Sequence, residues 1–145
     1  MAVIDRDDFH ILWLYFQSES MLGQHAAQIL PDGRIIYFLN NICDKSGNYY
    51  SAVRILNPVS RKVVWEFSGV PPHTLHSYTQ GYCQYLNDGN VLITVNNEAV
   101  DGNGYVIEVT SAGKIVWKWV PPDYDKLVTI NEGFTGVIRI TKKTL

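Results

Sequence analysis

Cysteine is scarce in this chain: only Cys43 and Cys83 occur among its 145 residues. They form no CxxC pair, and neither has a histidine at the spacing of a zinc finger. This pattern gives no sign of a disulfide framework or of a structural metal site. We therefore expect two free thiols and no bound metal.

Long apolar runs and an excess of positive charge are also missing. The apolar run at residues 9–16 is too short for a membrane helix, and it follows an acidic segment rather than the basic start of a signal peptide. The 12 Lys and Arg residues are scattered, and 14 Asp and Glu residues bring the formal net charge to −2. We expect neither a membrane nor a nucleic acid as partner, and the localisation stays unknown.

An internal repeat is the most informative feature that is present. Residues 25–36 align without a gap with residues 81–92, at an offset of 56 positions. Further on, residues 62–67 match residues 114–119 at an offset of 52 positions. Fixed periods of this length are typical of stacked or radially arranged structural units.

Each copy of the repeat has the pattern of four β-strands. Asp32-Gly33 and Asp88-Gly89 lie between apolar runs, and Asp-Gly is a typical connection between antiparallel strands. A second hairpin is predicted at residues 53–65 and again at residues 106–117, because these segments are rich in Val, Ile and Trp. Pro-Pro follows the Trp-bearing strand of both copies and ends it, since proline cannot donate to a strand ladder.

The predicted fold is all-β, with two four-stranded antiparallel sheets of the type that forms blades in β-propellers, all in a single domain. The expected parts are an N-terminal cap segment, two blades and a tail with a partial strand, at residues 1–23, 24–70, 80–122 and 123–145. Closed propellers usually have four to eight blades, so two blades make an incomplete ring. A homo-oligomer, additional N-terminal blades or the flanking segments must then cover the apolar faces.

Three tryptophans at the ends of the two copies are expected to pack between blades, namely Trp65, Trp117 and Trp119.

The repeat also resembles a known family. Residues 24–41 resemble the segment "QHDAQxLPNGNIxxFDNG" of the arylsulfotransferase family of β-propellers. Residues 81–93 are similar to the family's "GSAQRLPNGNTLI", and residues 106–117 to its "IFEVTPDGEIVWEY". Residues 136–139 are similar to the "VYRAxR" that ends many members. The resemblance covers the C-terminal part of such a propeller only.

This resemblance implies a chemistry and a nucleophile. Arylsulfotransferases transfer a sulfuryl group between phenols through a sulfated histidine, without added cofactor, and the resemblance places that histidine at His25. An imidazole nitrogen can attack sulfur and leave again when cationic groups stabilise the sulfuryl oxygens. Here Ala52 and Leu39 stand where the family has an arginine and an aspartate. The family's other histidines and arginines lie on blades that precede this segment.

Several functions therefore stay open, and so does the question whether the chain is an enzyme. The first hypothesis is a fragment or remnant of an arylsulfotransferase-like propeller that serves as a structural or interaction module without autonomous catalysis. The alternative is sulfuryl transfer from aryl sulfates to phenols by an oligomeric closed propeller that uses His25. A further alternative is a quinone-dependent dehydrogenase-type propeller. We expect no cofactor.

Two further histidines, His73 and His76, lie beside Pro71-Pro72 in the segment between the blades. They are candidate substrate-binding residues. Their spacing supplies no third ligand for a metal ion. His25 has a structural interpretation as well, as a histidine at the edge of a first strand that bonds to nearby backbone.

Overall fold

The computed structural model of the chain describes residues 1–16, 23–77, 80–96, 104–120 and 139. These residues contain β-strands and no α-helix, which confirms the all-β prediction. The strands are β1 (Ala2–Ile4), β2 (Ile11–Leu14), β3 (Gly23–Ile29), β4 (Ile35–Cys43), β5 (Tyr49–Asn57), β6 (Lys62–Phe67), β7 (Gly81–Tyr85), β8 (Val91–Val95), β9 (Tyr105–Val109) and β10 (Ile115–Trp119). No helix that could cross a membrane is found in the parts of the chain that are described.

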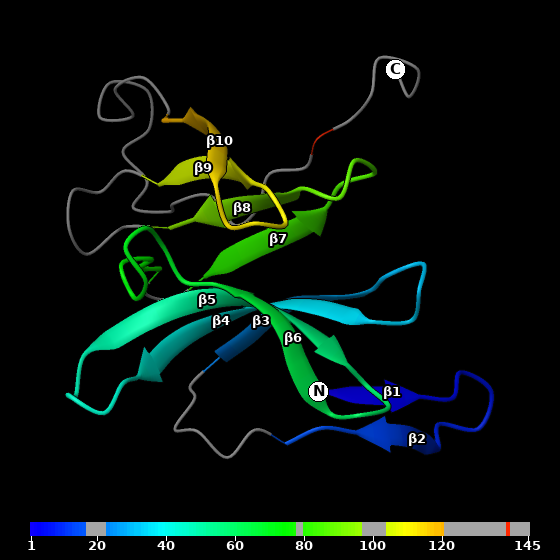
Figure 1. Ribbon diagram of the computed structural model, residues 1–145. Helices are drawn as coiled ribbons and strands as arrows, with labels where there is room; N and C mark the ends of the chain where they lie inside the picture. Colours follow the sequence, from blue (N-terminus) through cyan, green and yellow to red (C-terminus); the bar gives the residue numbers. More distant parts are fainter. Residues whose placement is uncertain (17–22, 78–79, 97–103, 121–138, 140–145) are drawn as a thin grey trace, which may run out of the picture.

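The strands form three antiparallel sheets. The first has the order β1-β2, the second β3-β4-β5-β6 and the third β7-β8-β9-β10, so each strand pairs with its neighbour in the chain. None of the three sheets closes on itself in the described residues. Figure 1 shows the sheets arranged in chain order, with β3–β6 between the two-stranded sheet and β7–β10.

The Asp-Gly pairs predicted as turns connect β3 to β4 and β7 to β8. Gly33 and Gly89 have φ angles of 83° and 85°, a region that glycine adopts without a steric penalty. The N–H of Gly33 donates to the carbonyl of Leu30 at 2.9 Å, and the N–H of Gly89 donates to that of Leu86 at 3.0 Å. The two turns therefore have the same geometry, which confirms their equivalence in the repeat.

The largest apolar cluster lies between the two four-stranded sheets and is named here the inter-sheet core. Its fully buried members are Leu30, Ile36, Phe38, Val53, Ile55, Phe67, Leu75, Cys83, Val91, Ile93, Val95, Ile107 and Val109. At its centre the Phe38 ring lies against Gly81, where a Cβ atom would overlap the ring. This close approach holds β4 and β7 side by side, and the buried apolar area is the main source of stability of the pair.

The opposite face of β3–β6 is covered by the two-stranded sheet. A second apolar cluster, named here the hairpin core, contains Ile35, Tyr37, Leu39, Ile42, Tyr50, Ala52 and Leu56. Met1, Trp13 and Tyr15 pack against it, and the rings of Trp13 and Tyr15 are stacked at 5.8 Å. The middle sheet is thus buried on both faces, which explains why β4 and β5 have nearly continuous apolar sequences.

The third apolar cluster lies on the face of β7–β10 that points away from β3–β6, which is named here the outer face. It contains Leu86, Leu92 and Val106. Arg139 is the described residue of the C-terminal tail, and it contacts this sheet. The partial strand predicted in the tail otherwise lies outside the described residues.

Candidate functional site

His25 lies on β3 and is half-buried. It pairs with Phe38 across the sheet, so it belongs to the face that carries the inter-sheet core. A bulge interrupts the pairing between His25 and Gln28, and Ala26 has a φ of 51°. The imidazole lies back over Gly23, because a Cβ there would be 2.8 Å from His25 Nε2. It therefore borders the gap between the two four-stranded sheets.

His73 and His76 lie on the segment that links β6 to β7, and both are exposed. The His73 ring stacks on Tyr50 at 4.0 Å, and its Nδ1 atom is 3.9 Å from the carboxylate of Asp44. The pKa of Asp44 is lowered, mainly because the backbone N–H of Asn48 donates to the carboxylate, with His73 as a smaller cause. Within the described residues, no hydrogen bond or ion pair joins His25 to His73 or His76.

Sulfuryl transfer needs cations around the reacting histidine. Arg34 and Arg54, which both pair with carboxylates, lie elsewhere in the structure. Arg34 bonds to Asp32 in the β3–β4 turn at 2.6 Å. Arg54 is nearly buried and bonds to Glu66 at 2.5 Å, on the face of β3–β6 opposite to His25. Within the described residues, the His25 imidazole has no hydrogen-bond or ion-pair partner.

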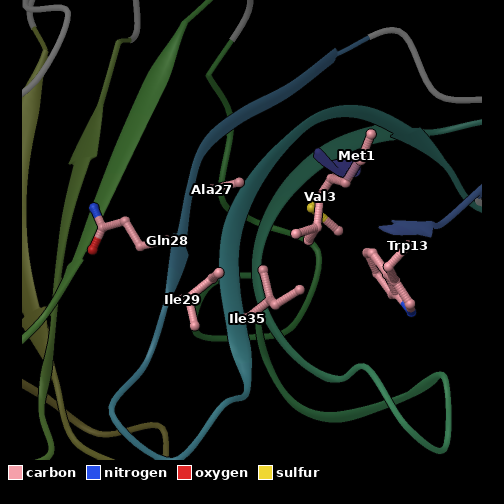
Figure 2. A pocket seen from close by; sticks show the side chains of 8 residues that line it. Met1, Val3, Trp13, Ala27, Gln28, Ile29 and Ile35 are labelled. Carbon is pink, nitrogen blue, oxygen red and sulfur yellow. The ribbon is translucent and has the colours of Figure 1, made fainter. Parts of the chain in front are cut away.

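A small apolar pocket lies between the two-stranded sheet and β3, and Figure 2 shows the side chains around it. Its volume is about 220 Å³, and Met1, Ala2, Val3, Trp13, Ala27, Gln28, Ile29 and Ile35 line it. The polar end of Gln28 points away from it, toward β7 (Figure 2), where it bonds to the Tyr82 hydroxyl and the Cys83 carbonyl. The pocket has no nucleophile and is smaller than a typical ligand site of roughly 300–1,000 Å³. It offers no catalytic chemistry.

A buried polar cluster fixes the β6–β7 linker to the ends of the strands. The hydroxyl of Ser51 donates to the carbonyl of Ser77 at 3.1 Å, and the N–H of Ser77 donates back to that hydroxyl at 2.9 Å. The amide of Asn40 donates to the carbonyls of Ser77 and Gln80, the latter at 3.0 Å. The N–H of Asn96 donates to the Ser77 hydroxyl at 3.0 Å. These hydrogen bonds connect residues at the ends of both four-stranded sheets, so the role of the cluster is structural.

The clearest recurring contact is made by tryptophan. The indole N–H of Trp65, on β6, donates at 2.8 Å to the carbonyl of Ser111 in the β9–β10 turn of the next sheet. The indole N–H of Trp13, on β2, likewise donates at 3.2 Å to the carbonyl of Pro58 in the β5–β6 turn. Trp117 is equivalent to Trp65 in the repeat, but its side chain lies on the outer face and is 47% exposed.

This pattern changes one expectation from the sequence. Trp65 packs against the inter-sheet core as predicted, whereas Trp117 and Trp119 are on the outer face and are exposed. Sequence reasoning also missed Trp13. Its signal is the spacing, since Trp13, Trp65 and Trp117 follow one another at intervals of 52 positions.

A recurring glutamine contact marks the same interfaces. Gln28 of β3 donates to the carbonyl of Cys83 at 2.9 Å, across the inter-sheet core. Gln84, its counterpart 56 positions later, donates to the carbonyl of Arg139 at 3.3 Å and accepts from the Arg139 N–H at 2.7 Å. Arg139 also bonds to Glu108 at 2.7 Å through its guanidinium. Cys83 and Arg139 are themselves 56 positions apart, so Arg139 occupies the equivalent place on the outer face.

Both cysteines are free thiols, as expected. Cys83 is fully buried in the inter-sheet core, and burial raises its pKa to about 12. No group of three or more His, Cys, Asp or Glu side chains that could hold a metal ion is found among the described residues.

Comparison with known proteins finds no match, whether with protein-family models, with curated proteins or with solved structures. The arylsulfotransferase resemblance therefore stays a prediction from the sequence.

Proposed function

We propose that this chain is a structural and interaction module, derived from an arylsulfotransferase-like propeller and without autonomous catalysis. Its role is to stack blade-type sheets face to face. The observation that carries the proposal is the tryptophan series at 52-residue spacing. Trp13 and Trp65 each bond to a turn of the following sheet, whereas the equivalent Trp117 is exposed on the outer face.

The surroundings of His25 support the absence of autonomous catalysis. A sulfuryl group carries negative charge on its oxygens, and its transfer depends on preorganised cations or donors close to the reacting atoms. The carboxylate-paired Arg34 and Arg54 lie at a turn and on the opposite face of the sheet. Within the described residues, the His25 imidazole has no hydrogen-bond or ion-pair partner that would stabilise the transition state.

Sulfuryl transfer from 4-nitrophenyl sulfate to phenol tests this proposal, with release of 4-nitrophenol as the readout. We expect the native chain and His25→Ala to show the same rate as a reaction without protein. His10→Ala is a matched control, because His10 is an exposed histidine in the β1–β2 turn, and that sheet covers the face of β3–β6 opposite to His25. Turnover by the native chain that is lost in His25→Ala and kept in His10→Ala would contradict the proposal and favour the enzyme.

A further inference from the structure

The two ends of the stack both present apolar side chains to solvent. At one end, Ile4 and Ile11 of the two-stranded sheet are 54% and 60% exposed. Ile4 follows Val3, which pairs with Trp13 on the face toward β3–β6, and Ile4 pairs with Ile11, so Ile4 and Ile11 lie on the face that points away from it. At the other end, Trp117 and Trp119 are 47% and 39% exposed on the outer face of β7–β10.

The repeat assigns each end a place in a four-stranded unit. Trp13 lies on β2 as Trp65 lies on β6, and β1 pairs with β2 as β5 pairs with β6. The two-stranded sheet thus corresponds to the third and fourth strands of a unit. Arg139 bonds to Gln84 in the same way as Cys83, a residue of the first strand β7, bonds to Gln28. Arg139 therefore occupies the position of a first-strand residue. One end therefore holds the second half of a unit, and the other holds the beginning of one.

The interface between the two four-stranded sheets shows what the outer face is built to contact. There, the indole of the fourth strand donates to the carbonyl of a turn between the third and fourth strands of the next unit, as Trp65 does to Ser111. The same chain carries such a turn at its other end, at residues 5–10 between β1 and β2. If the β1–β2 sheet of one copy packs after the β7–β10 sheet of another, as successive sheets pack within one chain, Trp117 meets this turn.

We infer that a second copy of the chain docks head to tail, with the exposed face of its β1–β2 sheet on the outer face of β7–β10. This inference rests on the proposed stacking function and names its partner. The Trp117 indole of one copy donates to a backbone carbonyl in the 5–10 turn of the other, and Trp117 and Trp119 cover Ile4 and Ile11. Such a contact is heterologous, so it forms a closed ring or a longer filament according to the rotation between copies.

The mass in solution, measured by sedimentation velocity over the micromolar range, tests this inference. We expect the native chain to form an assembly of at least two copies. Ile11→Asp removes the apolar contact of one end and Trp117→Asp that of the other, so each variant alone sediments as a single chain. Val59→Asp is the control, because Val59 is 93% exposed on the β5–β6 turn and belongs to neither face. It assembles like the native chain.

Mixing the two variants gives the decisive result. Each retains one intact face, and the two intact faces are complementary in a head-to-tail contact, so an equal mixture forms a complex of two chains. If one variant still self-associates, the contact joins identical faces and the inference is wrong. The inference is also wrong if the native chain stays a single chain, because the outer face then has another occupant.

Two further measurements keep the result unambiguous. Far-ultraviolet circular dichroism checks that each variant folds, and Ile4→Asp and Trp117→Gln replace any that does not. The sulfuryl-transfer assay is independent of these masses. If the native chain stays a single copy and shows no turnover, the inferred docking of a second copy is wrong and the proposed function is unaffected. Turnover that depends on His25 contradicts the proposed function itself.

Discussion

Phe38 and Gly81 set the closest approach between the two four-stranded sheets. The Phe38 ring is fully buried, and it occupies the space that a side chain at position 81 would need. Glycine is required here for its size, in contrast to Gly33 and Gly89, which are required for their positive φ. One methyl group at this point forces either the ring or the β7 backbone to move.

Gly81→Ala is therefore expected to lower the free energy of unfolding by about 1–3 kcal/mol, the usual cost of overpacking a dense core. Urea unfolding followed by tryptophan fluorescence measures this. Phe38→Leu in the same chain makes room for the methyl group, so the double variant should lose less stability than the sum of the two single variants. Simple additivity would show that the ring and the glycine do not constrain each other.

The two thiols differ in their surroundings, and their reactivity should differ accordingly. Cys83 is buried and its pKa is raised to about 12, so its reactive thiolate is scarce at neutral or mildly alkaline pH. Cys43 is partly exposed at the end of β4. With iodoacetamide at pH 8, we expect one modified site, Cys43, in the folded protein and two sites in urea. Mass spectrometry of peptides identifies them, and rapid modification of Cys83 in the folded protein would contradict this burial.

At the scale of the elements, the tryptophan contact joins strands of one sheet to a turn of the next. The Trp65 indole combines an apolar surface in the inter-sheet core with a hydrogen bond to Ser111. Packing and the hydrogen bond can be separated, because phenylalanine keeps an aromatic ring and lacks the N–H group.

Trp65→Phe is expected to cost about 1 kcal/mol of unfolding free energy, the usual net value of one hydrogen bond plus a small loss of packing. Trp117→Phe is the matched control, measured at a dilution at which the chain is a single copy. Its exposed indole has no counterpart of Ser111 on a following described sheet, so we expect a change below about 0.5 kcal/mol. Equal losses in both variants would mean that the Ser111 contact contributes nothing.

For the whole molecule, the middle sheet depends on covers on both faces. The two-stranded sheet is only a hairpin, and an isolated hairpin is marginally stable at best in water. It is held by Trp13 and Tyr15, which pack on the hairpin core, and by the bond from Trp13 to Pro58. In turn it shields Tyr37 and Leu39 from solvent.

Trp13→Ala should therefore lower the free energy of unfolding by about 2 kcal/mol, less than the 3–5 kcal/mol of a fully buried tryptophan because this one is half-buried. It should also increase binding of the dye ANS, since part of the hairpin core becomes exposed. Phe16→Ala is the control at an 81% exposed aromatic residue of the same segment. Identical behaviour of the two variants would show that Trp13 does not anchor the cover.

Much of the candidate site was beyond sequence reasoning. Residue type and the resemblance pointed to the histidines, yet within the described residues no hydrogen bond or ion pair joins His25 to His73 or His76. The contacts that define the interfaces came instead from Trp13, Gln28 and Arg139, residues with no chemical signature of their own. Their signal was the regular spacing of 52 or 56 positions, which becomes meaningful only when the bonded partners are known.

The sequence by itself determined the strands and the turns of the two four-stranded sheets. Asp-Gly pairs and alternating apolar residues act through φ angles and through neighbours along the chain, so the two copies fold alike locally. Only the tertiary structure decided which faces are covered. Trp65 and Trp117 have matching local sequences, yet one bonds to the next sheet and the other is exposed, because burial depends on what packs against each face in the folded structure.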